Sequence, residues 1–192
     1  MLRYTRRILT NDWGAWVPLV VVMSLTTALV GVCAHQFAWT HSSRFLAAVR
    51  IAGLRAEEFR IVSVSIYCCV ALIAAFSLTI IGAATVVRCA PDFRRWRLLG
   101  ATPTQVGATA CAMTAAASGI GAFAGSVFSV PASYVLIPWF NQMAAQSFPG
   151  GTGDFNPVFV PSPGALVASL ALSWLTCMLG AVGPVVRAAR MR

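Results

Sequence analysis

Four long stretches of apolar residues divide this chain, and they constrain its fold more than any other feature. They cover residues 13–32, 61–87, 104–137 and 164–186, and none contains Asp, Glu, Lys, Arg or His. A helix that spans a bilayer needs about 20 predominantly apolar residues, and each stretch supplies that number. The sequence therefore predicts an all-α integral membrane protein with four transmembrane helices.

The composition supports this interpretation and excludes a soluble domain. Only 10% of the residues are charged and the mean hydropathy is +0.78, whereas soluble domains carry about 25% charged residues. A net charge of +9 would favour nucleic-acid binding in a soluble protein, but here the arginines lie between the apolar stretches. Their place fits orientation in a membrane better. We therefore expect membrane lipid, and no nucleic acid, around this chain.

The distribution of arginine predicts the orientation of the helices. The N-terminal tail (1–12), the second connection (88–103) and the C-terminal tail (187–192) together carry ten arginines. The first connection (33–60) carries four, and the third (138–163) carries none. Arginine accumulates on the cytoplasmic side, so both termini are predicted to be cytoplasmic in a multi-pass protein of the plasma (inner) membrane.

The two outer connections differ in character. In residues 33–60, apolar side chains alternate with arginines at a spacing that suits an amphipathic helix lying on the membrane or leading into the second span. Residues 138–163 are rich in proline and glycine and predict an irregular loop. Pro131 and Pro138 are expected to kink and to stop the third helix. A lipoprotein-type cleavage before Cys33 is a weaker alternative, because Val32 is not the small residue such sites prefer.

The residues offer little support for catalysis by this chain. All 14 basic residues are arginine, which excludes a phosphate-loop ATPase and a Schiff-base enzyme, since both need lysine. The six cysteines form no CxxC pair, and His35 and His41 are spaced six apart, so neither set predicts a metal site. We expect no enzyme activity, no bound cofactor and no metal. The uncharged spans also disfavour a proton-driven transporter, which usually keeps ionisable groups inside the membrane.

The third stretch carries a stripe of small residues. Ala117, Gly121, Gly125 and Ser129 recur every four positions and therefore share one helix face. Small residues at this spacing allow two helices to approach closely. The stripe predicts a helix-packing interface, either within the chain or between two subunits.

The second connection is the most informative part of the chain. Phe93, Trp96 and Leu99 or Gly100 fall at helical spacing among arginines, Gly100 is suited to end a short helix, and Thr102 or Thr104 to cap the next. Pro103 fits the first turn of that next helix. One interpretation is a basic loop held against anionic lipid. The other is a docking element with an aromatic anchor for a protein partner.

This connection also carries a family resemblance. Arg97-Leu98-Leu99-Gly100-Ala101-Thr102, followed by Gln105-Val106, resembles the segment before a Gly- and Ala-rich helix in FtsX-like permeases of ABC transporters (MacB/LolC-type, type VII superfamily). The ending Gly183-Pro184-Val185-Val186-Arg187-Ala188-Ala189-Arg190 resembles the close of that family's last helix. The resemblance covers about residues 60–190. This chain differs by its 28-residue first connection, where many relatives carry a large extracytoplasmic domain.

The resemblance implies a permease subunit that couples ATP hydrolysis in a separate ATPase to export, extraction or mechanotransmission. It implies ABC ATPase subunits as partners, which bind the ATP and Mg²⁺, and a second permease subunit, identical or homologous. The expected ATPase-coupling residues are Arg94, Arg95, Trp96, Arg97, Leu98, Leu99, Gly100, Ala101 and Thr102. The alternative is a four-helix membrane scaffold or accessory protein with no transport cycle.

Overall fold

The computed structural model describes residues 13–147, 155 and 157–190, and the predicted tail 1–12 lies outside them. Within these residues the secondary structure is entirely helical, as predicted. The helices are α2 (Trp13–Thr40), α3 (Ser43–Ile51), α4 (Ala56–Arg88), α5 (Ala90–Leu98), α6 (Pro103–Ser147) and α7 (Pro163–Arg190).

Four of these helices, α2, α4, α6 and α7, are long and apolar enough to cross a membrane, which confirms the four predicted spans. At 1.5 Å per residue, the 33 residues of α4 reach about 50 Å and the 45 residues of α6 reach about 68 Å. The hydrocarbon core of a bilayer is only about 30 Å thick. Both helices therefore extend beyond it.

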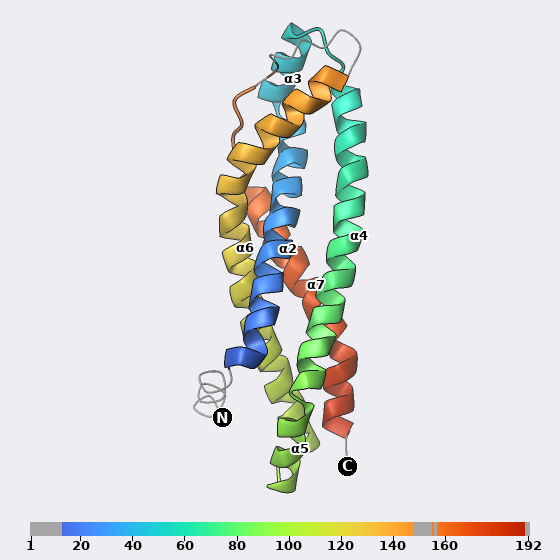
Figure 1. Ribbon diagram of the computed structural model, residues 1–192, viewed down its shortest axis with the longest axis vertical. Coiled ribbons are helices and arrows are strands. Elements are labelled where there is room, and N and C mark those ends of the chain that lie inside the picture. Colours follow the sequence, from blue (N-terminus) through green and yellow to red (C-terminus); the bar gives the residue numbers. More distant parts are fainter. Residues whose placement is uncertain (1–12, 148–154, 156, 191–192) are drawn as a thin grey trace.

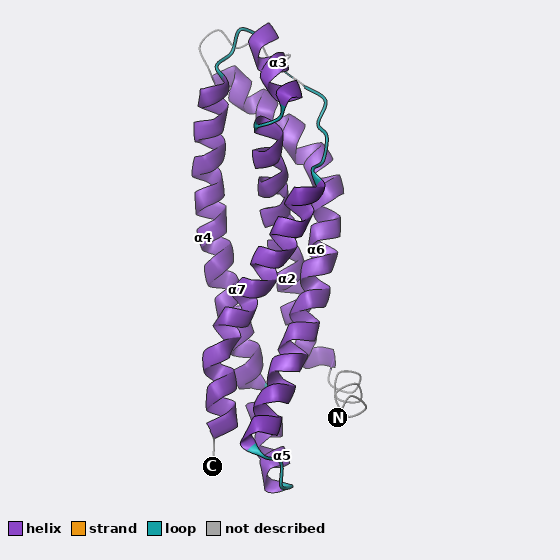
Figure 2. Cartoon of the chain, turned by 180° about the vertical axis from the view of Figure 1, so that it is seen from behind, coloured by secondary structure: helices purple, strands orange, loops and turns teal. Residues whose placement is uncertain are grey.

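The four long helices form an elongated bundle around α2 (Figure 1). Helix α2 packs against α4, α6 and α7, whereas α4 and α6 make little contact with each other. Helix α7 crosses α2 from the side of α6 to the side of α4, behind α2 in Figure 1 and in front of it in Figure 2. We call the two ends of the bundle the α3 end and the α5 end after the short helices that lie there (Figure 1).

The α3 end is closed by a cluster of aromatic side chains. Ser42 caps α3 by accepting a hydrogen bond from the Phe45 N–H (3.2 Å), and Phe45 and Val49 on the inner face of α3 are buried. The ring centroid of Phe45 lies 5.7 Å from the ring centroid of Phe59 and 5.9 Å from that of Phe155. The apolar face of the predicted amphipathic helix thus packs onto the chain itself and not onto a membrane surface, because aromatic side chains of the neighbouring segments cover it.

Several helix ends differ from the predicted boundaries. Helix α2 continues to Thr40, α4 already begins at Ala56, and α7 continues to Arg190. Helix α6 runs through Pro131 and Pro138 to Ser147, so Pro138 does not stop it. A proline removes one backbone donor and bends the helix, and α6 curves across the α3 end (Figure 1), where Ile137, Ala144 and Ala145 are buried in the aromatic cluster. This burial stabilises the helical continuation.

Candidate functional site

Helix α5 lies at the tip of the bundle, beyond the end of α4 (Figures 1 and 2). The buried Cys89 is the only residue between α4 and α5, and its φ and ψ of −83° and −3° redirect the chain into α5. Asp92 lies in the first turn of α5, and Arg95 and Arg97 lie in the last. Both signs of charge therefore match the helix dipole and favour a helix even though α5 has only nine residues.

Two aromatic residues attach α5 to the bundle. Phe93 is only 2% exposed and belongs to the core, and Trp96 packs against the same core while partly buried. Their ring centroids are 5.5 Å apart in an edge-to-face arrangement, a geometry that aromatic pairs favour. Trp96 is one of the expected coupling residues, and part of its ring packs against the core of its own chain. The helical spacing of Phe93 and Trp96 places both on the inner face.

The turn after α5 is defined by two consecutive capping motifs. The Ala101 N–H donates to the Trp96 carbonyl oxygen and the Gly100 N–H donates to the Arg97 carbonyl oxygen, both at 3.0 Å, which is the Schellman pattern. Gly100 has a φ of +93°, a left-handed conformation that glycine adopts without steric cost. This turn ends α5.

Helix α6 then begins with a capping box. The Gln105 N–H donates to the Thr102 hydroxyl oxygen (3.3 Å), and the Thr102 N–H donates to the Gln105 side-chain oxygen (3.1 Å). Pro103 is the first residue of α6, where its missing N–H costs nothing. Gln105 was not among the predicted site residues, although the Thr-x-x-Gln spacing is a sequence signal for this motif. Residues 100–105 therefore fix the angle between α5 and α6.

The outer face of α5 is both apolar and basic. Leu98 and Leu99 are each 84% exposed, and Arg94 and Arg95 are exposed as well. Arg95 forms an ion pair with Asp92 (3.5 Å) that is open to solvent and adds little stability. Arg97 and Ala101 are partly buried, whereas Gly100 and Thr102 are exposed. The predicted coupling residues thus divide into a partly buried set (Trp96, Arg97 and Ala101) and an exposed set, in which Arg94, Arg95, Leu98 and Leu99 form the outward tip of α5 and Gly100 and Thr102 belong to the turn.

The stripe of small residues on α6 lies against α2 of the same chain. Ala117, Gly121, Gly125 and Ser129 are all buried. A Cβ atom added to Gly121 would lie 2.6 Å from the Met23 Cβ, and one added to Gly125 would lie 2.8 Å from the Thr27 Cβ. The structure therefore uses this stripe for close packing between α2 and α6.

A buried pair of amide side chains at the α3 end was not predicted. Gln36 of α2 donates a hydrogen bond from its side-chain nitrogen to the Asn141 side-chain oxygen of α6 (2.7 Å), and both residues are at most 3% exposed. Nearby, the fully buried His35 accepts a hydrogen bond from the Ser162 N–H (3.3 Å). Each of these residues lies outside the predicted spans, so the sequence offered no reason to bury it.

The comparison with protein families agrees with this arrangement. The family model described as FtsX-like permease C-terminal matches residues 64–192, which include α5, α6, α7 and most of α4. Among curated proteins and among solved structures, none matches the chain. Permeases of this family work with ABC ATPase partners. With its four apolar helices and a match over most of its length, the chain belongs to the FtsX-like permease family and is a multi-pass membrane permease component of an ABC-type system.

Proposed function

We propose that this chain couples ATP hydrolysis in a separate ATPase subunit to export, extraction or mechanotransmission across the membrane, and that α5 is the docking element. The observation that most supports this role is at the tip of α5, where Leu98 and Leu99 are each 84% exposed beside exposed arginines. Burying a leucine side chain is worth about 1.5–3 kcal/mol. An exposed apolar pair with a basic rim is therefore suited to enter an apolar groove with acidic edges on the ATPase.

Movement of α5 would reach the rest of the chain through α6. The capping motifs at Gly100 and Thr102 hold α5 at a fixed angle to α6, and Phe93 and Trp96 hold it to the core. Helix α6 extends for 45 residues from this junction to the α3 end. A push on α5 by the ATPase would therefore shift α6 as a rigid body, as in other domain motions.

The chemistry of ATP belongs to the partner in this proposal. ATP and Mg²⁺ bind to the ATPase subunits, and this chain is not itself an enzyme. A second permease subunit, identical or homologous, completes the transmembrane part. The ten arginines of the α5 side and the two tails favour cytoplasmic termini and a place in the plasma (inner) membrane.

The test is recovery of the ATPase with tagged permease from native membranes, quantified by mass spectrometry. We expect the variant with Leu98→Ser and Leu99→Ser to recover at least ten-fold less ATPase, because the two leucine side chains would no longer be available for burial against the ATPase. Ile51→Ser is the matched control, since Ile51 is 89% exposed at the α3 end. Equal recovery from all three proteins, at equal abundance in the membrane, would remove the docking role from α5 and favour the accessory-protein alternative.

A further inference from the structure

A groove between three helices opens near the α3 end. Helices α4 and α7 are close at the other half of the bundle, where a Cβ atom on Gly180 would lie 2.6 Å from the Thr79 carbonyl oxygen. They diverge toward the α3 end and leave α2 between them (Figure 2). The cavity between them measures about 430 Å³, which is within the usual size of a small-molecule site.

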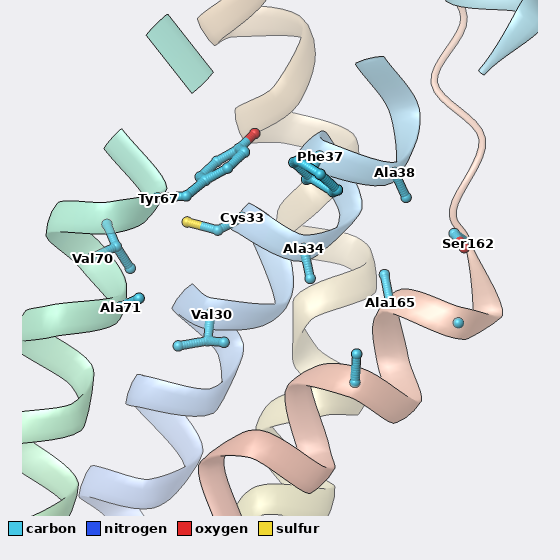
Figure 3. Close-up of a pocket in the computed structure, with 12 residues that line it drawn as sticks. Val30, Cys33, Ala34, Phe37, Ala38, Tyr67, Val70, Ala71, Ser162 and Ala165 are labelled. Carbon is cyan, nitrogen blue, oxygen red and sulfur yellow. The ribbon is translucent and has the colours of Figure 1, made fainter. Parts of the chain in front are cut away.

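The lining of this groove suits a hydrocarbon chain. Most of its lining side chains are small and apolar, and none is charged. Figure 3 shows Val30 and Ala34 on α2, with Val70 and Ala71 on one side and Ala165 on the other. The groove lies among helices apolar enough to cross the membrane, so a hydrocarbon chain of the bilayer can reach it without crossing water.

A second cavity, with more polar surface than the groove, adjoins it. It measures about 360 Å³ and shares Ala38 and Ser162 with the groove. Ser42, Ser43 and Arg44 line it and supply two hydroxyl groups and a guanidinium. Within the described residues, no carboxylate forms a salt bridge with Arg44, whose side chain is exposed. Arg44 is therefore available to an anionic group.

The junction between the two cavities is structurally fixed. Ser162 immediately precedes α7 and accepts a hydrogen bond from the Ala165 N–H (3.1 Å). The Ser162 N–H donates to the buried His35 of α2 (3.3 Å). These two bonds fix the loop at Ser162, which lines both cavities, so the two cavities lie directly next to each other.

We propose that this composite site binds one acidic phospholipid of the leaflet at the α3 end, with an acyl chain in the groove and the anionic headgroup at Arg44. The apolar part selects for a hydrocarbon chain, and the arginine with its neighbouring hydroxyl groups selects for a headgroup that carries a net negative charge. The proposal depends on the membrane location of the helices and not on docking of an ATPase. The bound lipid would pack against the half of α4 nearest the α3 end. Helix α4 as a whole contacts α6 only slightly.

The experiment is a lipid titration of the purified chain in mild detergent, followed by native mass spectrometry. The probes are phosphatidylglycerol and phosphatidylcholine with identical acyl chains. We expect one phosphatidylglycerol per chain, bound about five-fold more tightly than phosphatidylcholine, as one arginine near a lipid phosphate can provide. High salt should reduce this preference, since the headgroup contact is exposed.

Two pairs of variants separate the parts of the site. Arg44→Gln should lower phosphatidylglycerol binding to the phosphatidylcholine value, whereas Arg50→Gln, on an exposed position of the same helix, should not. Ala71→Phe should fill the groove and weaken both lipids at least ten-fold, whereas Ala84→Phe, exposed elsewhere on α4, should not. Equal binding of the two lipids by the wild-type chain would overturn the headgroup assignment. Unchanged binding by Ala71→Phe would overturn the groove, provided that all variants share the wild-type unfolding temperature.

Discussion

The backbone N–H of Ala101 donates a hydrogen bond to the carbonyl oxygen of Trp96 at 3.0 Å, and this bond closes the turn between α5 and α6. Both side chains also pack against the same core, so the turn is fixed by its backbone and by its packing. The motif that resembles the permease family is therefore a rigid joint. It ends the helix that carries Leu98 and begins the longest helix of the chain.

The first prediction concerns the left-handed residue of this joint. Gly100→Ala should cost about 1–2 kcal/mol, because a residue with a Cβ atom avoids a φ of +93°. Gly53→Ala is a matched control, since Gly53 also has positive φ and open space around its Cβ position. We expect similar losses of thermal stability in detergent for both variants and reduced ATPase recovery only for Gly100→Ala. Equal ATPase recovery from both would mean that the angle of the joint is unimportant for docking.

The second prediction separates the inner face of α5 from its tip. Trp96→Ala should lower the stability of the purified chain by about 2 kcal/mol, because a large ring is removed from the edge of the core. Leu99→Ser should leave that stability unchanged, since Leu99 is 84% exposed. Thermal unfolding of each purified variant measures the difference. A Trp96→Ala chain as stable as the wild type would show that this ring does not hold α5 to the bundle.

The third prediction tests the packing of α2 against α6. Gly125→Ala should destabilise the chain by about 1–3 kcal/mol, because the added methyl group meets the Ser24 backbone and the Thr27 side chain. Gly119→Ala, on the same helix, should be tolerated, since its nearest new neighbour is the Trp174 side chain at 3.6 Å, an ordinary contact. The measurement is the folded, monodisperse fraction after solubilisation. Normal yield of both proteins would contradict the close approach at Gly125.

The fourth prediction tests the orientation inferred from arginine counts. In a cysteine-free background, a cysteine at Ile51 should react with a membrane-impermeant thiol reagent in intact cells. One at Leu99 should react only after the membrane is opened. Both positions are more than 80% exposed, so burial would not mask the result. The opposite labelling pattern would place the α5 end outside and exclude its contact with a cytoplasmic ATPase.

The local features of the chain were predictable because they depend on near neighbours. An apolar run of sufficient length predicts a span, and all four predicted spans are present in the structure. Gly100 and Thr102 mark a helix end and a helix start by their own backbone chemistry, and the joint is found at these residues. The family resemblance, which rests on the same segment, is confirmed by the family match.

Other boundaries and faces depend on contacts between distant residues. Pro138 predicted an end to the third helix, but α6 continues beyond it to Ser147. Burial of Ile137 and Ala145 in the aromatic cluster stabilises this continuation. The spacing of Phe93 and Trp96 placed them on one helix face, and only the fold shows that this face packs against the core while Leu98 and Leu99 are exposed. Sequence spacing shows which residues share a helix face but not what that face meets.

By itself, the sequence determined that this protein is a four-span membrane protein of the FtsX-like type with a capped turn before its third span. These features are encoded within single continuous segments, because hydropathy and helix capping depend on residues that are close in the sequence. Only the tertiary structure decided that the small-residue stripe of α6 packs against α2, that α3 folds onto the aromatic cluster, and that α4 and α7 diverge to form the groove. The physical reason is that these features depend on which helix faces meet. That choice minimises the packing free energy of the whole bundle, and no single segment encodes it.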